Sequence, residues 1–191
     1  LRGTRRAHRA RVKIVAGELG GRVLKTPRGR AVRPTAARVR EALFQRIGPL
    51  SGAAVLDLFA GSGALGFEAL SRGAATCLFA DVAAASIACL RANVKALGLE
   101  RRAAVRRADF KRVLRDEARG GVRYDLVLLD PPYDAAAGYA AALGELLPPV
   151  LAPAALIVIE SAHGLELPLD LPADPPRRYG ASTIQILRNG P

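Results

Sequence analysis

Three glycines near the first long apolar run have the spacing of a nucleotide-binding loop. Gly61, Gly63 and Gly66 match the pattern G-x-G-x-x-G, and Asp81 follows Gly61 by 20 residues. In dinucleotide-binding proteins such a loop brings its backbone close to the cofactor, and the later acid accepts hydrogen bonds from a ribose. No Gly-Lys-Ser/Thr follows the glycines, so the segment is not a phosphate-gripping P-loop. Taken alone, the loop predicts a nucleotide-containing cofactor such as NAD.

Two further acids favour methyl transfer to an amine over hydride transfer. Asp57 precedes the glycines, where a carboxylate suits an amino group and would repel a pyrophosphate. A rigid tetrapeptide follows a strongly apolar segment; it is Asp130-Pro131-Pro132-Tyr133. Asp130 and the Pro131 carbonyl can accept the two hydrogens of an exocyclic amine, and a base can stack on Tyr133. As a strand-ending turn the tetrapeptide would carry no chemistry, but beside the other acids it predicts a catalytic site.

Apolar strands and helices alternate around these residues. Strands are expected at residues 53–57, 76–80, 104–106, 124–129 and 155–160, helices at 64–71, 83–97, 111–118 and 135–147, and a closing hairpin at 178–187. Continuous apolar strands between helices are typical of a parallel sheet covered on both faces. Because such sheets bind ligands at the carboxyl ends of their strands, we expect Asp57, Asp81 and Asp130 to lie at one edge.

Basic residues are concentrated at the N-terminus. The 191 residues include 29 Lys+Arg and 17 Asp+Glu, a net charge of +12. Residues 1–40 hold 13 of the basic residues and one acid, whereas the other 151 residues hold 16 of each. Long cationic segments usually bind nucleic acid. A second basic cluster over residues 101–115 is interrupted by Asp109 and followed by Asp116, so we expect it to be mainly a solvated face.

Within the basic segment, alternation around Gly20-Gly21 predicts a β-hairpin of residues 12–15 and 22–25, and a helix is expected from Thr35 to Ile47. We therefore predict a basic arm and hairpin over residues 1–34 and a catalytic domain over residues 35–191. The side chains expected to contact nucleic-acid phosphates are Arg11, Lys13, Arg22, Lys25, Arg28 and Arg30.

The remaining composition excludes several classes of protein. No apolar run approaches the roughly 20 residues of a membrane span. Cys77 and Cys89 are too few for a disulfide scaffold and fit no zinc pattern, so we expect small core residues, no metal and a reducing cytoplasm. We expect a monomer.

The motifs resemble those of a known family. The glycine loop together with Asp130 to Tyr133 is similar to class I S-adenosylmethionine-dependent methyltransferases that act on amines. Three upstream segments are similar to the RsmD family, whose members methylate the N2 amine of a guanine in bacterial 16S rRNA. These segments are Leu19-Gly20-Gly21-Arg22, Arg33-Pro34-Thr35 and Arg38-Val39-Arg40-Glu41-Ala42-Leu43-Phe44. The resemblance runs from Val12 to Leu187.

The resemblance implies a Rossmann-like α/β class I methyltransferase fold: a seven-stranded, mostly parallel sheet with helices on both faces, preceded by a small N-terminal β-hairpin. It implies S-adenosyl-L-methionine as cofactor and 16S rRNA, in the small ribosomal (30S) subunit, as partner. It also implies cofactor contacts from Arg33, Thr35, Asp57, Ala60, Gly61, Ser62, Gly63, Asp81, Asp109 and Phe110, and a guanine site at Asp130, Pro131, Pro132 and Tyr133. Asp81-Val82 and Ala108-Asp109 depart from the family's usual pairs but keep the acid.

Three alternatives stay open. The tetrapeptide serves exocyclic amines in general, so a DNA adenine-N6 or cytosine-N4 methyltransferase is the first, although the sequence leaves little room for a target-recognition domain. The second is a nucleic-acid-binding module with a vestigial cofactor site, which intact Asp57, Asp81 and Asp130 disfavour. The third is an NAD oxidoreductase.

Overall fold

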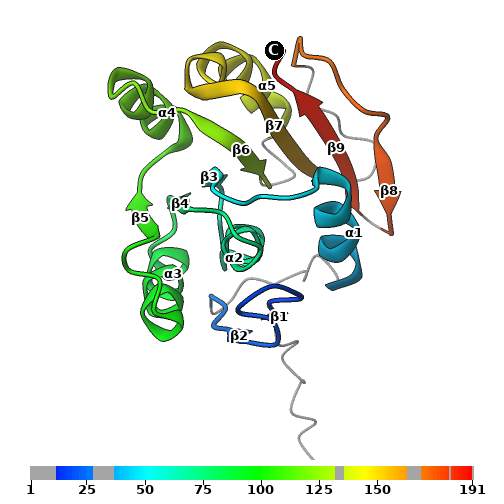
Figure 1. Ribbon diagram of the computed structural model, residues 1–191. Coiled ribbons are helices and arrows are strands. Elements are labelled where there is room, and N and C mark those ends of the chain that lie inside the picture. Colours follow the sequence, from blue (N-terminus) through cyan, green and yellow to red (C-terminus); the bar gives the residue numbers. More distant parts are fainter. Residues whose placement is uncertain (1–11, 28–36, 132–135, 163–168, 181, 191) are drawn as a thin grey trace, which may run out of the picture.

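The computed structural model describes residues 12–27, 37–131, 136–162, 169–180 and 182–190 (Figure 1). Its centre is a seven-stranded sheet in the order β5-β4-β3-β6-β7-β9-β8. Strands β5, β4, β3, β6 and β7 are parallel, and β9 runs antiparallel to both β7 and β8. The strands are β3 (Ala54–Leu58), β4 (Thr76–Asp81), β5 (Ala103–Arg107), β6 (Tyr124–Leu129), β7 (Leu151–Ala162), β8 (Arg177–Tyr179) and β9 (Ser182–Arg188). The predicted mostly parallel sheet and its closing hairpin are confirmed.

Helices cover both faces of the sheet. One apolar layer contains side chains of α1, α2 and α3, and the other contains side chains of α4 and α5. The helices are α1 (Ala37–Ile47), α2 (Ala64–Ser71), α3 (Ala84–Leu97), α4 (Phe110–Arg119) and α5 (Ala136–Leu146), and a short 3-10 turn, η2 (Pro148–Val150), precedes β7. Since both faces are covered, the central strands are apolar at successive positions, which is why they show no alternation in the sequence.

The exception to this apolar pattern in β3 is Asp57. Val55 lies in the layer of α1, α2 and α3, while Leu56 and Leu58 lie in the layer of α4 and α5. Side chains alternate between faces along a strand, so Asp57 lies on the same face as Val55. A buried carboxylate thus stands where packing alone would favour another apolar side chain.

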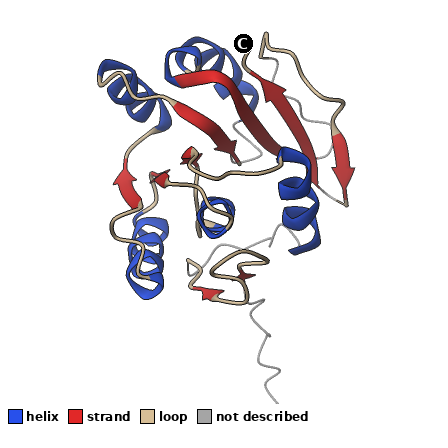
Figure 2. Cartoon of the chain, in the orientation of Figure 1, coloured by secondary structure: helices blue, strands red, loops and turns tan. Residues whose placement is uncertain are grey.

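The N-terminal hairpin is shorter than predicted (Figure 2). Its strands are β1 (Val12–Lys13) and β2 (Val23–Leu24), paired Val12 to Leu24 and Lys13 to Val23. Val12, Ile14 and Leu24 are buried in the same apolar layer as α1 and α2. The hairpin therefore packs on the body of the molecule, and the domain boundary predicted after residue 34 lies outside the described residues.

Two further expectations need correction. Cys77 is buried, but Cys89 on α3 is partly exposed. The basic cluster is only partly a solvated face: Arg102 donates to the carbonyls of Leu70 (2.8 Å) and Ala74 (2.7 Å), and Arg106 pairs with Glu117 at 2.9 Å. Both arginines approach groups from distant segments, which a local run of charges does not reveal. Within the described part of the chain, no helix is long and apolar enough to cross a membrane.

Candidate cofactor and catalytic site

Three carboxylates meet at the carboxyl edge of the sheet. Leu58 at the end of β3 pairs with Ala80 of β4 on one side and with Leu129 of β6 on the other. Because the three strands end together, Asp57, Asp81 and Asp130 come to the same edge. The charges of Asp130 and Asp81 both raise the pKa of Asp57, which places the three groups within electrostatic reach.

Asp57 is almost completely buried, with 3% of its surface exposed. Its Oδ2 accepts a hydrogen bond from the Gly66 N–H at 3.0 Å, in the first turns of α2. Burial raises the pKa of Asp57 to about 8; the Gly66 hydrogen bond opposes this shift, and the charges of Asp130 and Asp81 add to it. At neutral pH this carboxyl is therefore largely protonated, and a cationic group beside it would favour its ionised form.

The glycine loop connects β3 to α2 by a tight path. Phe59 and Gly61 both have positive φ, at 62° and 56°. Gly63, at φ 78°, donates its N–H to the Ala60 carbonyl at 2.7 Å and stands directly before α2. A Cβ at Gly63 would lie 2.6 Å from Leu90 Cδ2 and equally close to a ring carbon of Phe67. Glycine at position 63 is thus required both by backbone conformation and by close packing.

Asp81 ties this loop to the end of β4. Its Oδ2 accepts the Gly61 N–H at 2.9 Å, and its Oδ1 accepts the Ala83 N–H at 2.8 Å. A carboxylate oxygen can accept more than one hydrogen bond, so both oxygens can also receive the hydroxyl groups of a ligand. Asp81 can therefore shape the loop and hold a ribose at the same time.

A pocket opens beside Asp81, and its lining combines two carboxylates with aromatic and small apolar side chains. It is lined by Leu58, Phe59, Ala80, Asp81, Val82, Ala108, Asp109, Phe110 and Tyr139. Asp109 is exposed and caps α4 by accepting the Lys111 N–H at 2.9 Å. The predicted acids Asp81 and Asp109 and the predicted Phe110 thus lie around one hollow.

The sequence interpretation missed six residues of this pocket: Leu58, Phe59, Ala80, Val82, Ala108 and Tyr139. The Phe59 and Tyr139 rings are stacked, with centroids 5.6 Å apart and planes at 10°, and both rings contact Phe110 at 5.4 and 5.0 Å. Val82 is 60% exposed. Tyr139 had one signal in the sequence: it is an aromatic residue within the alanine-rich segment that follows the tetrapeptide.

The other predicted site residues divide into two groups. Asp130 is exposed and Pro131 is buried where β6 ends, while Lys13, Arg22 and Lys25 are exposed around the hairpin. The second group lies outside the described residues and consists of Arg11, Arg28, Arg30, Arg33, Thr35, Pro132 and Tyr133. In the described segments, no group of three or more His, Cys, Asp or Glu side chains is arranged to hold a metal.

Residues 12–188 match the model of a protein family described as conserved hypothetical protein 95. The chain belongs to this family. The match covers the hairpin, the sheet and the closing strands, and together with the relatives below it confirms the relationship to the RsmD family and the class I methyltransferase fold.

Curated relatives and a solved structure agree with this assignment. The chain is 42% identical over 123 residues to the putative rRNA methyltransferase YlbH of Bacillus subtilis, covering 64% of this chain and 67% of YlbH. It is 37% identical over 123 residues to ribosomal RNA small subunit methyltransferase D of Escherichia coli, covering 64% of this chain and only 60% of that relative. The solved structure of the putative methyltransferase YhhF of Escherichia coli shares 31% identity and a TM-score of 0.79, over 94% of this chain and 98% of that one.

Proposed function

We propose that this chain transfers a methyl group from S-adenosyl-L-methionine to the exocyclic N2 amine of a guanine in 16S rRNA, on the assembled small ribosomal subunit. The observation that carries the proposal is the position of Asp130 and Pro131 at the same sheet edge as Asp57 and the glycine loop. The names of the RsmD-family relatives support an rRNA substrate. With that substrate, the chain would act in the cytoplasm, as a monomer.

The site suits S-adenosylmethionine in charge and shape. Asp57 and the backbone of residues 60–63 would hold the methionine part, whose ammonium group offsets the buried carboxylate. Asp81 would accept the ribose hydroxyls, and Asp109 with Phe110 would contact the adenine. Arg33 and Thr35 would close over the methionine end. When bound, this cofactor supplies an electrophilic methyl group on a positively charged sulfur.

The amine needs orientation, because its lone pair is delocalised into the guanine ring. Asp130 would accept a hydrogen bond from one N2 hydrogen and the Pro131 carbonyl would accept the other, so that the lone pair points towards the methyl group. Tyr133 would stack on the base, which has to leave its own stack to reach the site. Pro132 would keep the acceptors rigid. Asp130 then takes the proton that the amine loses. Most of the acceleration comes from positioning.

The hairpin would bind the RNA backbone through its exposed cations. Lys13, Arg22 and Lys25 are exposed around β1 and β2. Together with Arg11, Arg28 and Arg30 they give the proposed interface a positive charge opposite the phosphates. Such contacts fix the register of the RNA, while the selection of the base is left to the site at the sheet edge.

The experiment that tests this function identifies the methylated nucleoside. Purified protein is incubated with labelled S-adenosylmethionine and, in parallel, with small subunits lacking the modification, naked 16S rRNA and duplex DNA. The proposal predicts N2-methylguanosine from the subunits. Label in DNA as N6-methyladenine or N4-methylcytosine would overturn the RNA substrate, and cofactor binding without label in any substrate would leave only a binding module.

A further inference from the structure

One buried amide connects the hairpin to the glycine loop. Asn93 on α3 is 2% exposed. Its Oδ1 accepts the Lys25 N–H at 2.8 Å, and its Nδ2 donates to the Lys25 carbonyl at 3.0 Å. The same Nδ2 donates to the Ser62 carbonyl at 3.3 Å. A single side chain thus holds both backbone groups of Lys25 and one backbone group of the glycine loop.

The same helix supports the glycine loop at a second point. Leu90 lies one turn before Asn93 and is completely buried. A Cβ at Gly63 would lie 2.6 Å from Leu90 Cδ2, so this helix packs directly against the loop. One turn of α3 therefore contacts both Ser62 and Gly63, and a shift of that turn would move the backbone proposed to hold the cofactor.

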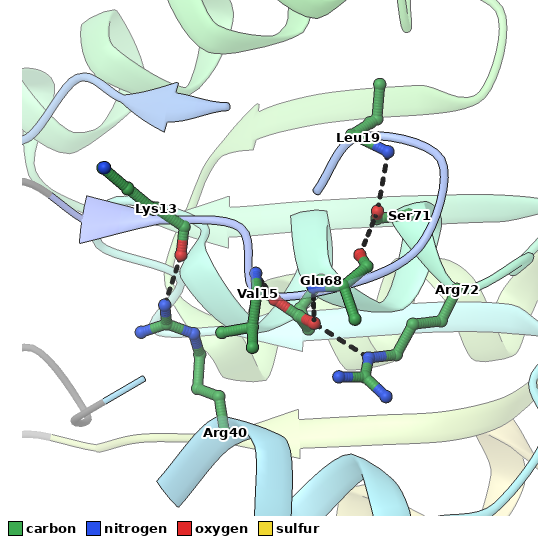
Figure 3. Close-up of polar contacts among 8 residues, drawn as sticks. Lys13, Val15, Leu19, Arg40, Glu68, Ser71 and Arg72 are labelled. Carbon is green, nitrogen blue, oxygen red and sulfur yellow. Dashed lines mark hydrogen bonds and ion pairs between the residues drawn. The ribbon is translucent and has the colours of Figure 1, made fainter. Parts of the chain in front are cut away.

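Further anchors of the N-terminal segment are Arg40 on α1, which donates to the Lys13 carbonyl, and Glu68 and Ser71 on α2 (Figure 3). Glu68 accepts the N–H groups of Val15 and Ala16, and Ser71 accepts the Leu19 N–H at 2.9 Å and donates to the Ala16 carbonyl at 2.5 Å. Ser71 is the last residue of α2, seven residues after the helix begins at Ala64. These contacts fix the hairpin without contacting residues 60–63.

We propose that Asn93 is a positioning residue that couples RNA binding at the hairpin to cofactor binding at the glycine loop. The Lys25 side chain is exposed, so its ammonium group can bind an RNA phosphate. That contact restrains Lys25, and the Lys25 backbone is hydrogen-bonded to Asn93. Asn93 then favours the position of Ser62 that the cofactor requires. By linkage the effect is reciprocal: bound cofactor strengthens RNA binding by the same factor. This inference rests on the proposed function.

The test measures binding of S-adenosylhomocysteine, the unreactive product, with and without unmodified small ribosomal subunits. In the unaltered protein we expect subunits to tighten this binding about fivefold or more, the low end of ordinary coupling. Asn93→Leu, similar in volume but unable to make the three hydrogen bonds, should reduce the factor to about one. The matched control, Ser71→Ala, removes two hydrogen bonds to the N-terminal segment but should keep the coupling.

A second variant separates coupling from folding. Asn93→Asp keeps an acceptor for the Lys25 N–H but loses the donor to the Lys25 and Ser62 carbonyls, so one hydrogen bond to the hairpin remains while the bond to the loop is lost. Cys89 gives an independent readout, because the Lys25 ammonium lowers the pKa of this thiol against the larger effect of burial, which raises it. Cys77 is buried and gives little background. If Asn93→Leu frees the hairpin, the Lys25 ammonium moves away from Cys89 and the pKa of this thiol rises, so we expect thiol reagents to modify Cys89 more slowly in this variant.

The outcomes distinguish this inference from the proposed function. Coupling lost in both Asn93 variants and kept in Ser71→Ala would support the role of Asn93. Coupling kept in Asn93→Leu, or lost equally in Ser71→Ala, would overturn it, as would an unaltered protein that methylates subunits without any coupling. If the unaltered protein binds cofactor but neither binds nor methylates subunits, the proposed function itself fails.

Discussion

The N-terminal hairpin and the seven-stranded sheet are both β structure, but different interactions hold them in place. The central strands of the sheet, such as β3, have backbone ladders on both sides and apolar side chains on both faces. The hairpin has two paired positions. Its segment is held by the buried apolar side chains of Val12, Ile14 and Leu24 and by buried polar side chains of the adjacent helices: Arg40, Glu68, Ser71 and Asn93. A short hairpin is marginal by itself, so this one depends on the body of the molecule for its structure.

That dependence separates two roles within one small element. The groups that face inwards are the buried apolar side chains of Val12, Ile14 and Leu24, together with backbone N–H and carbonyl groups that bind to side chains of α2 and α3. The side chains of Lys13, Arg22 and Lys25 face outwards; they are exposed and are not part of the core. Substitutions of the inward anchors should therefore change stability, and substitutions of the outward cations should change RNA binding.

The largest effect on stability is expected from Glu68→Ala. Glu68 is completely buried and accepts the Val15 N–H at 2.7 Å, the Ala16 N–H at 3.1 Å and Arg72 Nε at 2.8 Å. Its removal leaves two amides and a cation without their acceptor, at a cost of about 3–5 kcal/mol in the free energy of unfolding. Urea denaturation measures the change.

The control for Glu68 is Glu18→Ala, which removes a carboxylate from the same interface. The Glu18 side chain is 53% exposed and pairs with Arg102, so its loss should cost less than about 1 kcal/mol. Similar losses in the two variants would show that the buried anchor is no more important than a surface ion pair.

A smaller loss is expected from Gly63→Ala, which disturbs the loop instead of the hairpin. A left-handed conformation costs an alanine about 1–2 kcal/mol, and the contacts of 2.6 Å with Leu90 and Phe67 add an overpacking cost, for about 2–4 kcal/mol together. Gly61→Ala is the control, because its nearest neighbouring atom would be 3.9 Å away and only backbone strain applies. Equal losses of unfolding free energy in urea would contradict the packing argument.

A further effect comes from the pH dependence of Asp57. Its pKa is raised to about 8 in the folded protein against an ordinary value of 3.8. Between these values the unfolded chain is ionised and the folded one is not, so folding takes up a proton and stability falls as the pH rises. The slope approaches about 1.4 kcal/mol per pH unit near neutrality. Asp57→Asn should lack this fall between pH 6 and pH 7, and identical pH profiles for the two proteins would refute the assigned shift.

The smallest effect on stability, within about 1 kcal/mol, is expected when Lys13, Arg22 and Lys25 are all replaced by alanine, because the three side chains are exposed. RNA binding should change instead: the slope of log affinity against log salt should fall by about two to three. Filter binding at several salt concentrations measures it. An unchanged slope would remove the hairpin from the interface. The control set is exposed on α4 and consists of Arg112, Arg115 and Arg119.

The same contrast explains what could be predicted from the sequence. The apolar run at residues 124–129 predicts β6 with its observed bounds, because burial on both faces leaves a continuous local signal. Asp57, Asp81 and Asp130 could be predicted as site residues because each lies at or near the end of an apolar strand. The carboxyl ends of neighbouring parallel strands meet at one edge of the sheet. The helix from Ala64 to Ser71 was also predicted with its observed bounds, as α2.

What the sequence could not reveal depends on contacts between distant segments. Glu68 lies in a short helix and looks like an ordinary surface charge, yet its partners Val15 and Ala16 are 53 and 52 residues away. Asn93 has no motif, and its partner Lys25 is 68 residues away. Tyr139 reaches the pocket only because α5 packs beside Phe59 and Phe110. Tertiary packing determines these contacts, so local sequence patterns cannot predict them.

The measurement that tests the central claim most directly is single-turnover methylation of unmodified small subunits by Asp130→Ala, paired with its affinity for S-adenosylhomocysteine. Asp130 lies at the carboxyl end of β6, and the control, Asp125→Ala, removes an exposed carboxylate near the other end of the same strand. We predict that Asp130→Ala binds the cofactor product nearly as well as the unaltered protein but transfers methyl groups at least about 100-fold more slowly, while Asp125→Ala keeps its transfer rate. Transfer by Asp130→Ala at the unaltered rate would contradict the account.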